Sequence, residues 1–199
     1  MKPTLSIPHP AESLVLSKVP AHIREIAATI KLVAFDVDGV LTDGSLWYGE
    51  NGEQLKRFHS LDGHGLKMLQ QSGIMVALVT GREGPVVPRR AAELGIGELY
   101  QNVRDKSQLI EELASRHGIG LEQIAFMGDD IIDLPAMHKS GLSISVPNAP
   151  SYIIQAAQWV TSLPGGSGAA RECCDMILAS QGALSQYLHS TRLTGPVIQ

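Results

Sequence analysis

The chain is poor in cysteine, in aromatic residues and in excess charge of either sign. Of 199 residues only Cys173 and Cys174 are cysteines, and their adjacency suits neither a zinc site nor a disulfide framework. Sixteen Lys and Arg against twenty Asp and Glu give a net charge of −4, which provides no general attraction to nucleic acid or to an anionic membrane. We therefore expect a protein of a reducing compartment that binds neither.

Long apolar runs, internal repeats and low-complexity tracts are also missing. No stretch approaches the roughly eighteen apolar residues of a membrane span. The first thirty residues contain Pro8, Pro10 and Glu12 where a signal peptide would need an apolar run. With 44% hydrophobic residues and a mean hydropathy of +0.05, the chain suits one packed domain better than a disordered state. A cytoplasmic globular protein is the prediction.

Short apolar runs alternate with amphipathic stretches, the pattern of βαβ units in a parallel sheet. The predicted strands are residues 32–35, 75–79, 124–127 and 142–146. Helices are predicted over 86–94 and 107–117, closed by Gly95 and Gly118, because glycine commonly follows a helix end. The expected fold class is α/β, with a doubly wound and mostly parallel sheet.

One segment breaks this alternation. Residues 45–60 carry two apolar stretches around Asn51-Gly52, the signal of a β-hairpin with a tight turn. Its Leu46, Trp47, Tyr48 and Phe58 are too apolar for a lone ribbon in water, so they pack either in the core or at an interface.

The domain organisation follows from these elements. A flexible joint is expected at 164–170, before a final helix from about 171 to 189. We divide the chain into an extension at 1–29, one domain at 30–190 with the hairpin insert at about 45–60, and a tail at 191–199.

Two carboxylates, Asp36 and Asp38, stand where the first predicted strand meets its loop. Residues i and i+2 leave a strand on the same face, and ligands of doubly wound sheets bind beyond the carboxyl ends of the strands. An isolated Asp-x-Asp-Gly is also an ordinary turn sequence. Further chemistry in order favours a site: Thr80-Gly81 follows the second strand, Lys106 opens a helix, and Gly128-Asp129-Asp130 follows the third strand.

Acidic residues collected at one sheet edge need positive charge. Two carboxylates about 4 Å apart repel by roughly 4 kcal/mol at an effective dielectric of about 20. A hard divalent cation, Mg²⁺ in particular, answers this requirement. Lys106 and Thr80 supply the ammonium and hydroxyl that a phosphoryl group binds. Asp133, four residues after Asp129, can orient Lys106 rather than touch the metal.

Taken together, DVDGVLTDG at 36–44, Thr80-Gly81-Arg82, Lys106 and GDDIID at 128–133 resemble the four motifs of the haloacid dehalogenase-like phosphohydrolases. The resemblance implies a Rossmann-like fold, Asp36 as a nucleophile that becomes an aspartyl-phosphate, and Asp38 as the general acid and base. It implies Mg²⁺ held by Asp36, the backbone carbonyl of Asp38, and Asp129. It implies that Thr80, Gly81 and Lys106 bind the phosphate. Asp130 and Asp133 would support the metal ligands without binding the metal themselves.

From about residue 30 to 188 the chain is most similar to members of that family that carry a small hairpin in place of a large cap domain. The resemblance implies a homotetramer in lipopolysaccharide precursor synthesis, acting on the phosphate of a small acidic eight-carbon keto-sugar. It implies a hairpin packed between subunits and a glycine-rich segment at 165–172 that can reach a neighbouring site. The implied sugar-binding residues are Asp38, His59, Ser60, Leu61, Asp62, Gly63, Lys67, Arg82 and Arg90.

The substrate carboxylate needs a cationic contact, and arginine is its usual planar partner, which makes Arg82 and Arg90 the candidates. Ser60-Leu61 and Lys67 depart from the more basic pattern expected there, and His64 can bind substrate or simply pack. Three alternatives remain: a nine-carbon keto-sugar acid phosphate as substrate, a phosphoryl-accepting receiver domain, and a non-catalytic oligomerisation module. The order of the acidic motifs disfavours the receiver, and the presence of both Asp36 and Asp38 disfavours the module.

Overall fold

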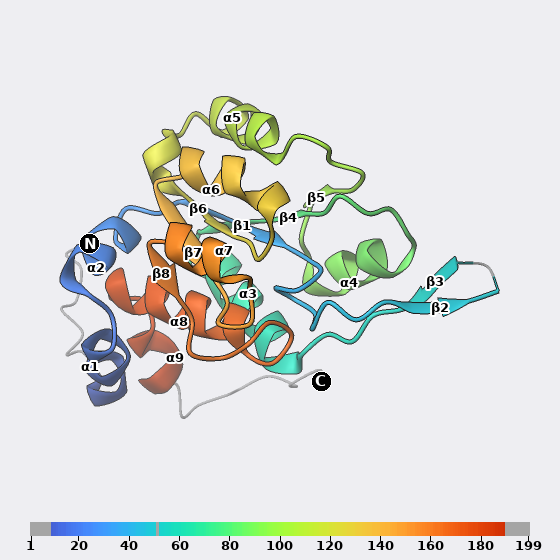
Figure 1. Cartoon of the computed structure of the whole chain (residues 1–199). Coiled ribbons are helices and arrows are strands. Elements are labelled where there is room, and N and C mark those ends of the chain that lie inside the picture. The colour runs from blue at the N-terminus through green and yellow to red at the C-terminus, as the bar shows by residue number, and fades with distance from the viewer. Residues whose placement is uncertain (1–8, 51, 190–199) are drawn as a thin grey trace.

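The computed structural model describes residues 9–50 and 52–189. A parallel sheet crosses the centre, helices cover both of its faces, and a two-stranded hairpin projects from one end (Figure 1). The strand order of the main sheet is β5-β4-β1-β6-β7-β8. Its strands are β1 (Leu32–Asp36), β4 (Met75–Val79), β5 (Glu98–Tyr100), β6 (Ile124–Met127), β7 (Leu142–Ser145) and β8 (Trp159–Val160).

Helices separate the strands and sort onto the two faces. Helices α5 and α6 pack together on one face, and α3 and α8 pack together on the other (Figure 1). The helices are α1 (Pro10–Ser17), α2 (Ala21–Ala27), α3 (Ser60–Gln71), α4 (Val86–Leu94), α5 (Lys106–His117), α6 (Leu134–Lys139), α7 (Ser151–Ala156), α8 (Ala169–Ser180) and α9 (Ser185–His189), with short 3₁₀ turns η1 (Leu121–Gln123) and η2 (Ile131–Asp133).

The predicted α/β class and parallel sheet are confirmed. Every residue of β1 is buried because the strand pairs with β4 on one side and β6 on the other, beneath helices on both faces. Strands β1, β4, β6 and β7 match the predicted runs to within one residue at each end. Both expected glycine caps are present, since Gly95 and Gly118 adopt φ of 70° and 61° directly after α4 and α5.

The prediction of one final helix from about 171 to 189 is wrong, because this segment forms two helices. Helix α8 ends at Ser180 and α9 begins at Ser185, with Gly182 at φ 66° between them. A left-handed residue cannot continue an α-helix, so the apolar pattern that spans the break is not one continuous element.

The flexible joint predicted at 164–170 is also wrong. The Gly166 N–H donates to the Val40 carbonyl at 3.0 Å, and a Cβ added at Gly165 would lie 1.7 Å from the Gly39 carbonyl oxygen. Glycine is present here because two stretches of backbone lie against each other, and the segment is packed on the loop after β1.

The start of the described chain is folded onto its end. Helices α1 and α2 pack on α8. The buried Glu12 carboxylate accepts hydrogen bonds from Ser185 N–H and Oγ at 2.7 and 2.6 Å. The first residues of the expected extension, 1–8, and the expected tail at 191–199 lie outside the described residues. Within the described part, no helix combines the length and apolarity needed to cross a membrane.

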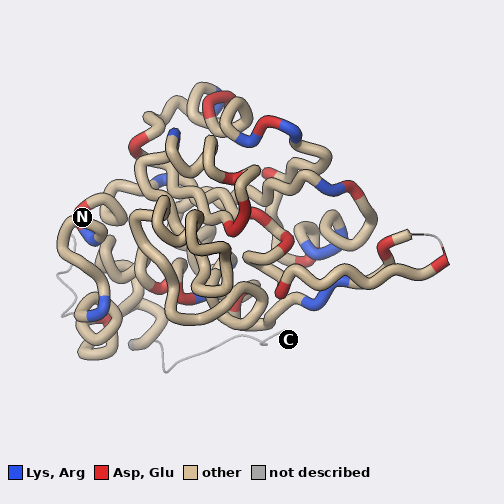
Figure 2. Tube along the Cα trace, in the orientation of Figure 1, with Lys and Arg blue, Asp and Glu red and all other residues tan. Residues whose placement is uncertain are grey.

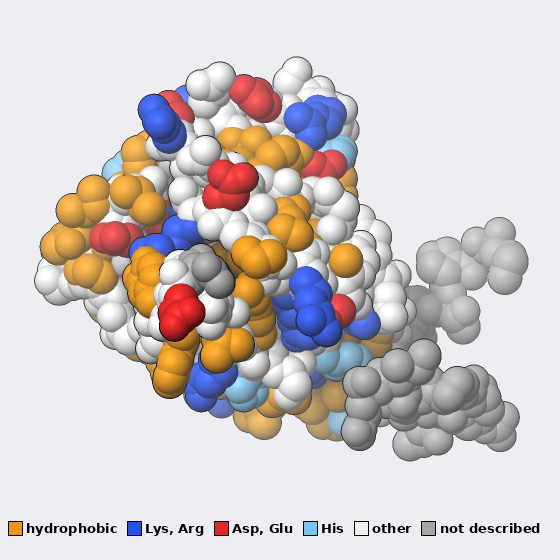
Figure 3. All heavy atoms as spheres, turned by 90° about the vertical axis from the view of Figure 1, so that its right-hand side faces the viewer, with side chains coloured by type: hydrophobic (Ala, Val, Ile, Leu, Met, Phe, Trp, Pro, Cys, Tyr) orange, Lys and Arg blue, Asp and Glu red, His pale blue; other side chains and the backbone are white. Residues whose placement is uncertain are grey.

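The hairpin insert consists of β2 (Trp47–Gly49) and β3 (Gly52–Leu55). Gly52 of the expected Asn51-Gly52 turn is the first residue of β3 and pairs with Gly49, and Asn51 lies outside the described residues. Its apolar residues are expected to pack either in the core or at an interface, and they do not all behave alike. Phe58 packs against the core, whereas Trp47 and Leu55 are 57% and 63% exposed. Figure 3 looks onto this end and shows hydrophobic side chains gathered around the hairpin.

Candidate active site

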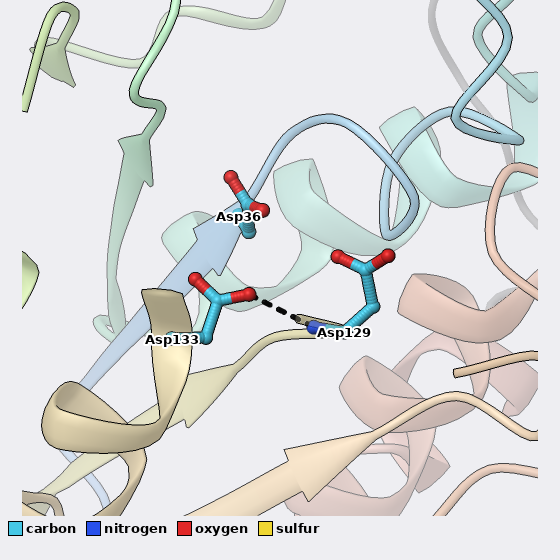
Figure 4. Close-up of side chains that lie close together, drawn as sticks. All are labelled: Asp36, Asp129 and Asp133. Carbon is cyan, nitrogen blue, oxygen red and sulfur yellow. Dashed lines mark hydrogen bonds between the residues drawn. The ribbon is translucent and has the colours of Figure 1, made fainter. Parts of the chain in front are cut away.

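Acidic residues collect where the central strands of the sheet end (Figure 2). Asp36 is the last residue of β1 and Asp129 follows β6, its parallel neighbour, with Gly128 between. Figure 4 shows the carboxylates of Asp36, Asp129 and Asp133 converging from β1, the loop after β6, and η2. One oxygen from each lies within 4.8 Å of the others. The acidic residues that stand apart in the sequence therefore form one cluster in space, as predicted.

Lys106 lies in the same cluster, brought there as the first residue of α5. The Asp105 carboxylate caps this helix by accepting from the Ser107 and Gln108 N–H groups, both at 3.0 Å. The Lys106 Nζ lies 2.9 Å from Asp36 Oδ1 and 2.5 Å from Asp133 Oδ1, and its side chain is 1% exposed. The ammonium therefore joins the end of β1 to η2.

Asp133 has both of its oxygens engaged. While Oδ1 accepts from Lys106, Oδ2 accepts from the backbone N–H groups of Asp129 and Asp130 at 3.0 and 3.1 Å. The exposed Asp130 instead caps η2 by accepting from the Ile131 N–H. Asp133 thus fixes both the lysine and the loop that carries Asp129, and it has little capacity left to bind a metal.

The cluster holds more negative charge than Lys106 balances. Burial raises the pKa of Asp36 to about 8, with a further rise from Asp133 that Lys106 partly offsets. Burial also raises the pKa of Asp129 to about 7, with Asp133 and Asp130 adding to the effect. Another positive charge beside Lys106 would allow these carboxylates to stay ionised at neutral pH.

The donor set fits a hard divalent cation. Asp129 Oδ1 is buried and has no hydrogen-bond partner within residues 9–50 and 52–189, which is costly unless something else binds it. The absence of a side chain at Gly39 makes space for the Asp129 carboxylate, since a Cβ there would lie 1.9 Å from Asp129 Oδ2. Carboxylate oxygens from Asp36 and Asp129 beside a loop carbonyl are the ligands that Mg²⁺ prefers in proteins.

Thr80 and Gly81 follow β4, on the other side of β1. Val79 pairs with Asp36, so the buried Thr80 stands at the same sheet edge as the acidic cluster. The Thr80 hydroxyl accepts from the Arg82 N–H at 3.1 Å, while the Gly81 backbone is exposed. A hydroxyl and open backbone N–H groups are suited to bind phosphoryl oxygens.

Sequence reasoning missed two residues at this edge, Lys56 and Glu53. The Asp38 Oδ1 lies 2.5 Å from Lys56 Nζ, which also lies 2.6 Å from Glu53 Oε1. Both residues come from the hairpin, and the Lys56 side chain is only 3% exposed. Their opposite charges three residues apart beside the Asp38 loop were the available signal.

The residues expected to bind a sugar fall into distinct environments. Arg82 lies beside Asp38 and Glu53, at 3.8 and 3.6 Å, whereas Arg90 lies over Gly63 and the Phe58 ring. Ser60 and Arg90 line a hollow of about 290 Å³ with Phe58, Val86, Arg89 and Glu93.

The others lie around the start of α3. Asp62 is buried, and its carboxylate accepts from the Gly168 and Arg171 N–H groups at 3.3 and 2.8 Å, so the structure gives it the glycine-rich segment as partner. His59 precedes α3, and its buried Nδ1 has no hydrogen-bond partner in the part of the chain that the structure describes. Leu61 is 53% exposed, and Lys67 is half-buried. His64 is exposed.

Comparisons with known proteins show what this chain is similar to. A family model for haloacid dehalogenase-like hydrolases matches residues 90–171. The 3-deoxy-D-manno-octulosonate 8-phosphate phosphatase KdsC of Salmonella typhi is 44% identical over 168 residues, covering 84% of this chain and 89% of that protein.

Two solved structures are similar over most of their length. The Moraxella catarrhalis phosphatase of the same name, in complex with magnesium, phosphate and KDO, has a TM-score of 0.82 and 41% identity, covering 84% of this chain and 96% of that one. The cobalt-bound Haemophilus influenzae enzyme has a TM-score of 0.79 and 45% identity, covering 81% and 95%.

Proposed function

This chain belongs to the haloacid dehalogenase-like hydrolases, in the family of the 3-deoxy-D-manno-octulosonate 8-phosphate phosphatases, and from that premise we propose that it hydrolyses this sugar phosphate with Mg²⁺. It is a phosphoric monoester hydrolase that releases 3-deoxy-D-manno-octulosonate and phosphate. The observation that carries the proposal is the buried contact of Asp36 with Lys106 beside Asp129, in a chain 44% identical to a curated phosphatase over 168 residues.

Asp36 is the proposed nucleophile. Its Oδ1 already accepts from the Val37 N–H at 2.7 Å and from Lys106, so we assign the attack on phosphorus to Oδ2. The attack forms an aspartyl-phosphate and divides one difficult displacement into two easier steps. Phosphate-monoester hydrolysis needs accelerations of up to about 10²¹, so several groups have to act together.

The remaining residues stabilise charge and move protons. Lys106, the Thr80 hydroxyl and the Gly81 N–H hold phosphoryl oxygens, where charge accumulates in the transition state. Asp38 protonates the leaving alcohol and then takes a proton from the water that hydrolyses the acyl phosphate. When bound by Asp36, Asp129 and the Asp38 carbonyl, Mg²⁺ would neutralise the carboxylates and polarise a phosphoryl oxygen.

Substrate recognition is assigned to the arginines and to the start of α3. Arg82, beside Asp38, is suited to bind the sugar carboxylate, and Arg90 lines the hollow with Ser60. His59, Leu61, Gly63 and Lys67 extend the same surface. Asp62 is proposed to act through the glycine-rich segment that it holds, because its oxygens are already occupied.

The assembly is proposed to be a homotetramer. Leu46, Trp47, Tyr48 and Leu55 leave an apolar hairpin surface that a second copy of the chain would cover. We place the enzyme in the cytoplasm, in the supply of lipopolysaccharide precursors.

The test is phosphate release with Mg²⁺ from a panel of eight- and nine-carbon keto-sugar acid phosphates and simple aryl phosphates. We expect a preference for the eight-carbon substrate and no turnover by Asp36→Asn or Asp38→Asn. Preference for the nine-carbon acid would reassign the substrate, and equal rates on all compounds would reject a specific sugar phosphatase. Arg82→Ala should raise KM more for the acidic sugar than for a neutral phosphate, and an unchanged ratio would remove its role.

A further inference from the structure

The base of the hairpin brings four charges into one closed network. Lys56 Nζ contacts the carboxylates of Asp38 and Glu53, and Arg82 completes the network, with Nε 3.8 Å from Asp38 Oδ2 and Nη1 3.6 Å from Glu53 Oε2. Two acids are therefore matched by two bases. Three of these residues play no part in the attack on phosphorus, yet all of them surround Asp38.

Lys56 is held as an ion in spite of being enclosed. Burial opposes its charge, but two carboxylates lie against its Nζ, Asp38 Oδ1 at 2.5 Å and Glu53 Oε1 at 2.6 Å. Its contact with Asp38 at 2.5 Å is shorter than that of Arg82, whose side chain is 44% exposed. The carboxylate of Asp38 is thus fixed mainly from the hairpin side, by a lysine that Glu53 holds in turn.

The two oxygens of Asp38 differ as a result. Oδ1 receives the ammonium, whereas the buried Oδ2 has no hydrogen-bond partner among the described residues and faces Arg82 Nε only at 3.8 Å. A carboxyl group held through one oxygen presents the other in a defined direction, which is the requirement for proton transfer to a bound substrate. A buried ion pair contributes little net stability compared with apolar residues, so a role in placement explains Lys56 better than a role in holding the fold.

We propose that Lys56, held by Glu53, is a positioning residue that fixes Asp38 through Oδ1 so that Oδ2 carries the proton to the leaving alcohol. The inference rests on the proposed function. In the step concerned, the bond from Asp36 Oδ2 to phosphorus forms as the phosphorus–oxygen ester bond breaks. The electron pair of that bond goes to the leaving oxygen, which takes the proton from Asp38, while Lys56 keeps all its protons.

The experiment compares leaving groups. An alkyl phosphate such as the sugar substrate needs its leaving oxygen protonated, whereas 4-nitrophenyl phosphate releases a stable phenolate without that help. We measure kcat/KM, which reports the step up to formation of the acyl phosphate, for Lys56→Met, Lys56→Arg and wild type on both compounds. Arg57→Met is the matched control, since this neighbouring hairpin cation is exposed and contacts Asp43 and the Gly166 carbonyl rather than Asp38.

Lys56→Met should lower kcat/KM for the alkyl phosphate about 10- to 100-fold more than for 4-nitrophenyl phosphate, as expected when a general acid worth about 10²–10⁴ is misplaced. Lys56→Arg should restore most of the loss, and Arg57→Met should change neither value. A crystal structure of Lys56→Met should show the Asp38 carboxyl rotated.

Several results would overturn the inference. Equal losses on both leaving groups would make Lys56 a structural residue, and a higher KM with unchanged kcat would make it a substrate contact. An unmoved Asp38 in the variant crystal structure would contradict it without any activity measurement. If wild type hydrolyses other alkyl phosphates but not the keto-sugar acid phosphate, the proposed function fails, while the leaving-group comparison still decides the role of Lys56.

Discussion

The strand-end cluster and the hairpin tip are built in opposite ways. Asp36, Lys106 and Asp133 are at most 7% exposed at their side chains and are fixed by one another and by the ends of β1 and β6. The hairpin strands β2 and β3 pair with each other in a sheet of their own, and Tyr48 and Leu55 are 65% and 63% exposed. The buried charges that fix one another lie at the end of the sheet, and the exposed apolar surface suited to association lies on the ribbon.

The difference is also energetic. Ions at the cluster are removed from water and depend on their partners, so deleting one of them leaves its neighbours uncompensated. Substitution of an exposed side chain usually changes the free energy of unfolding by less than about 0.5 kcal/mol. Substitutions should therefore separate the two regions, with large effects at the cluster and small ones on the fold at the hairpin.

The largest effect is expected for Asp36→Asn. Loss of the proposed nucleophile should reduce phosphate release by at least about 10³-fold, while the melting temperature changes little because Lys106 keeps Asp133 as its partner. Asp43→Asn, a matched change in the same motif at a partly exposed residue, should retain activity. Activity of Asp36→Asn within tenfold of wild type would disprove the assignment of the nucleophile.

Lys106→Met should produce the largest loss of stability. It leaves Asp36 and Asp133 without their shared cation, at a cost of about 3–5 kcal/mol in the free energy of unfolding. Lys139→Met removes the partner of Glu111 in a surface pair and should cost at most about 1 kcal/mol. Urea unfolding of both variants measures the contrast, and similar losses would show that the cluster is not the more demanding region.

Adding Mg²⁺ should stabilise the cluster selectively. At one hundred times its Kd, a bound ion adds about 2.7 kcal/mol. For a chain of this size that corresponds to a rise of roughly 5–10 °C in Tm. Asp129→Asn should abolish the rise, and Asp130→Asn, one residue away and exposed, should keep most of it. A rise that survives Asp129→Asn would place the ion elsewhere.

The smallest effect on the fold is expected at the hairpin. Leu55→Ser should leave the far-ultraviolet circular dichroism spectrum unchanged while shifting sedimentation from the proposed tetramer to smaller species. Leu14→Ser on α1 is matched in type and in exposure, at 63% for each leucine, and should leave the assembly intact. Equal sedimentation of both variants and wild type would remove the hairpin from the proposed interface.

Much of the cluster could be predicted because its signals are local. Asp36, Thr80 and Asp129 each follow an apolar run, and parallel strands bring such run ends to one edge. The bond between Lys56 and Asp38 could not be found in this way, since it depends on how the hairpin folds back over the loop after β1. Charge pairs distant in sequence leave no periodic pattern.

The prediction of a flexible joint at 164–170 is wrong for a related reason. Composition alone cannot distinguish glycines that allow motion from glycines that allow contact, and Gly165 and Gly166 are of the second kind. The break at Gly182 shows the same limit, because the apolar pattern continues through it. Where two backbone segments pack together, the second segment decides whether a glycine is mobile or packed. The local sequence does not contain that information.

The packing of Gly165 and Gly166 against Gly39 and Val40 has a consequence for how the protein folds during its synthesis. The loop bearing Asp38 emerges from the ribosome before the backbone that supports it, because Gly165 and Gly166 stand much further along the chain. In a nascent chain this loop therefore stays unbraced until residues 165–166 have been made, and hydrolytic competence has to wait for that backbone to dock.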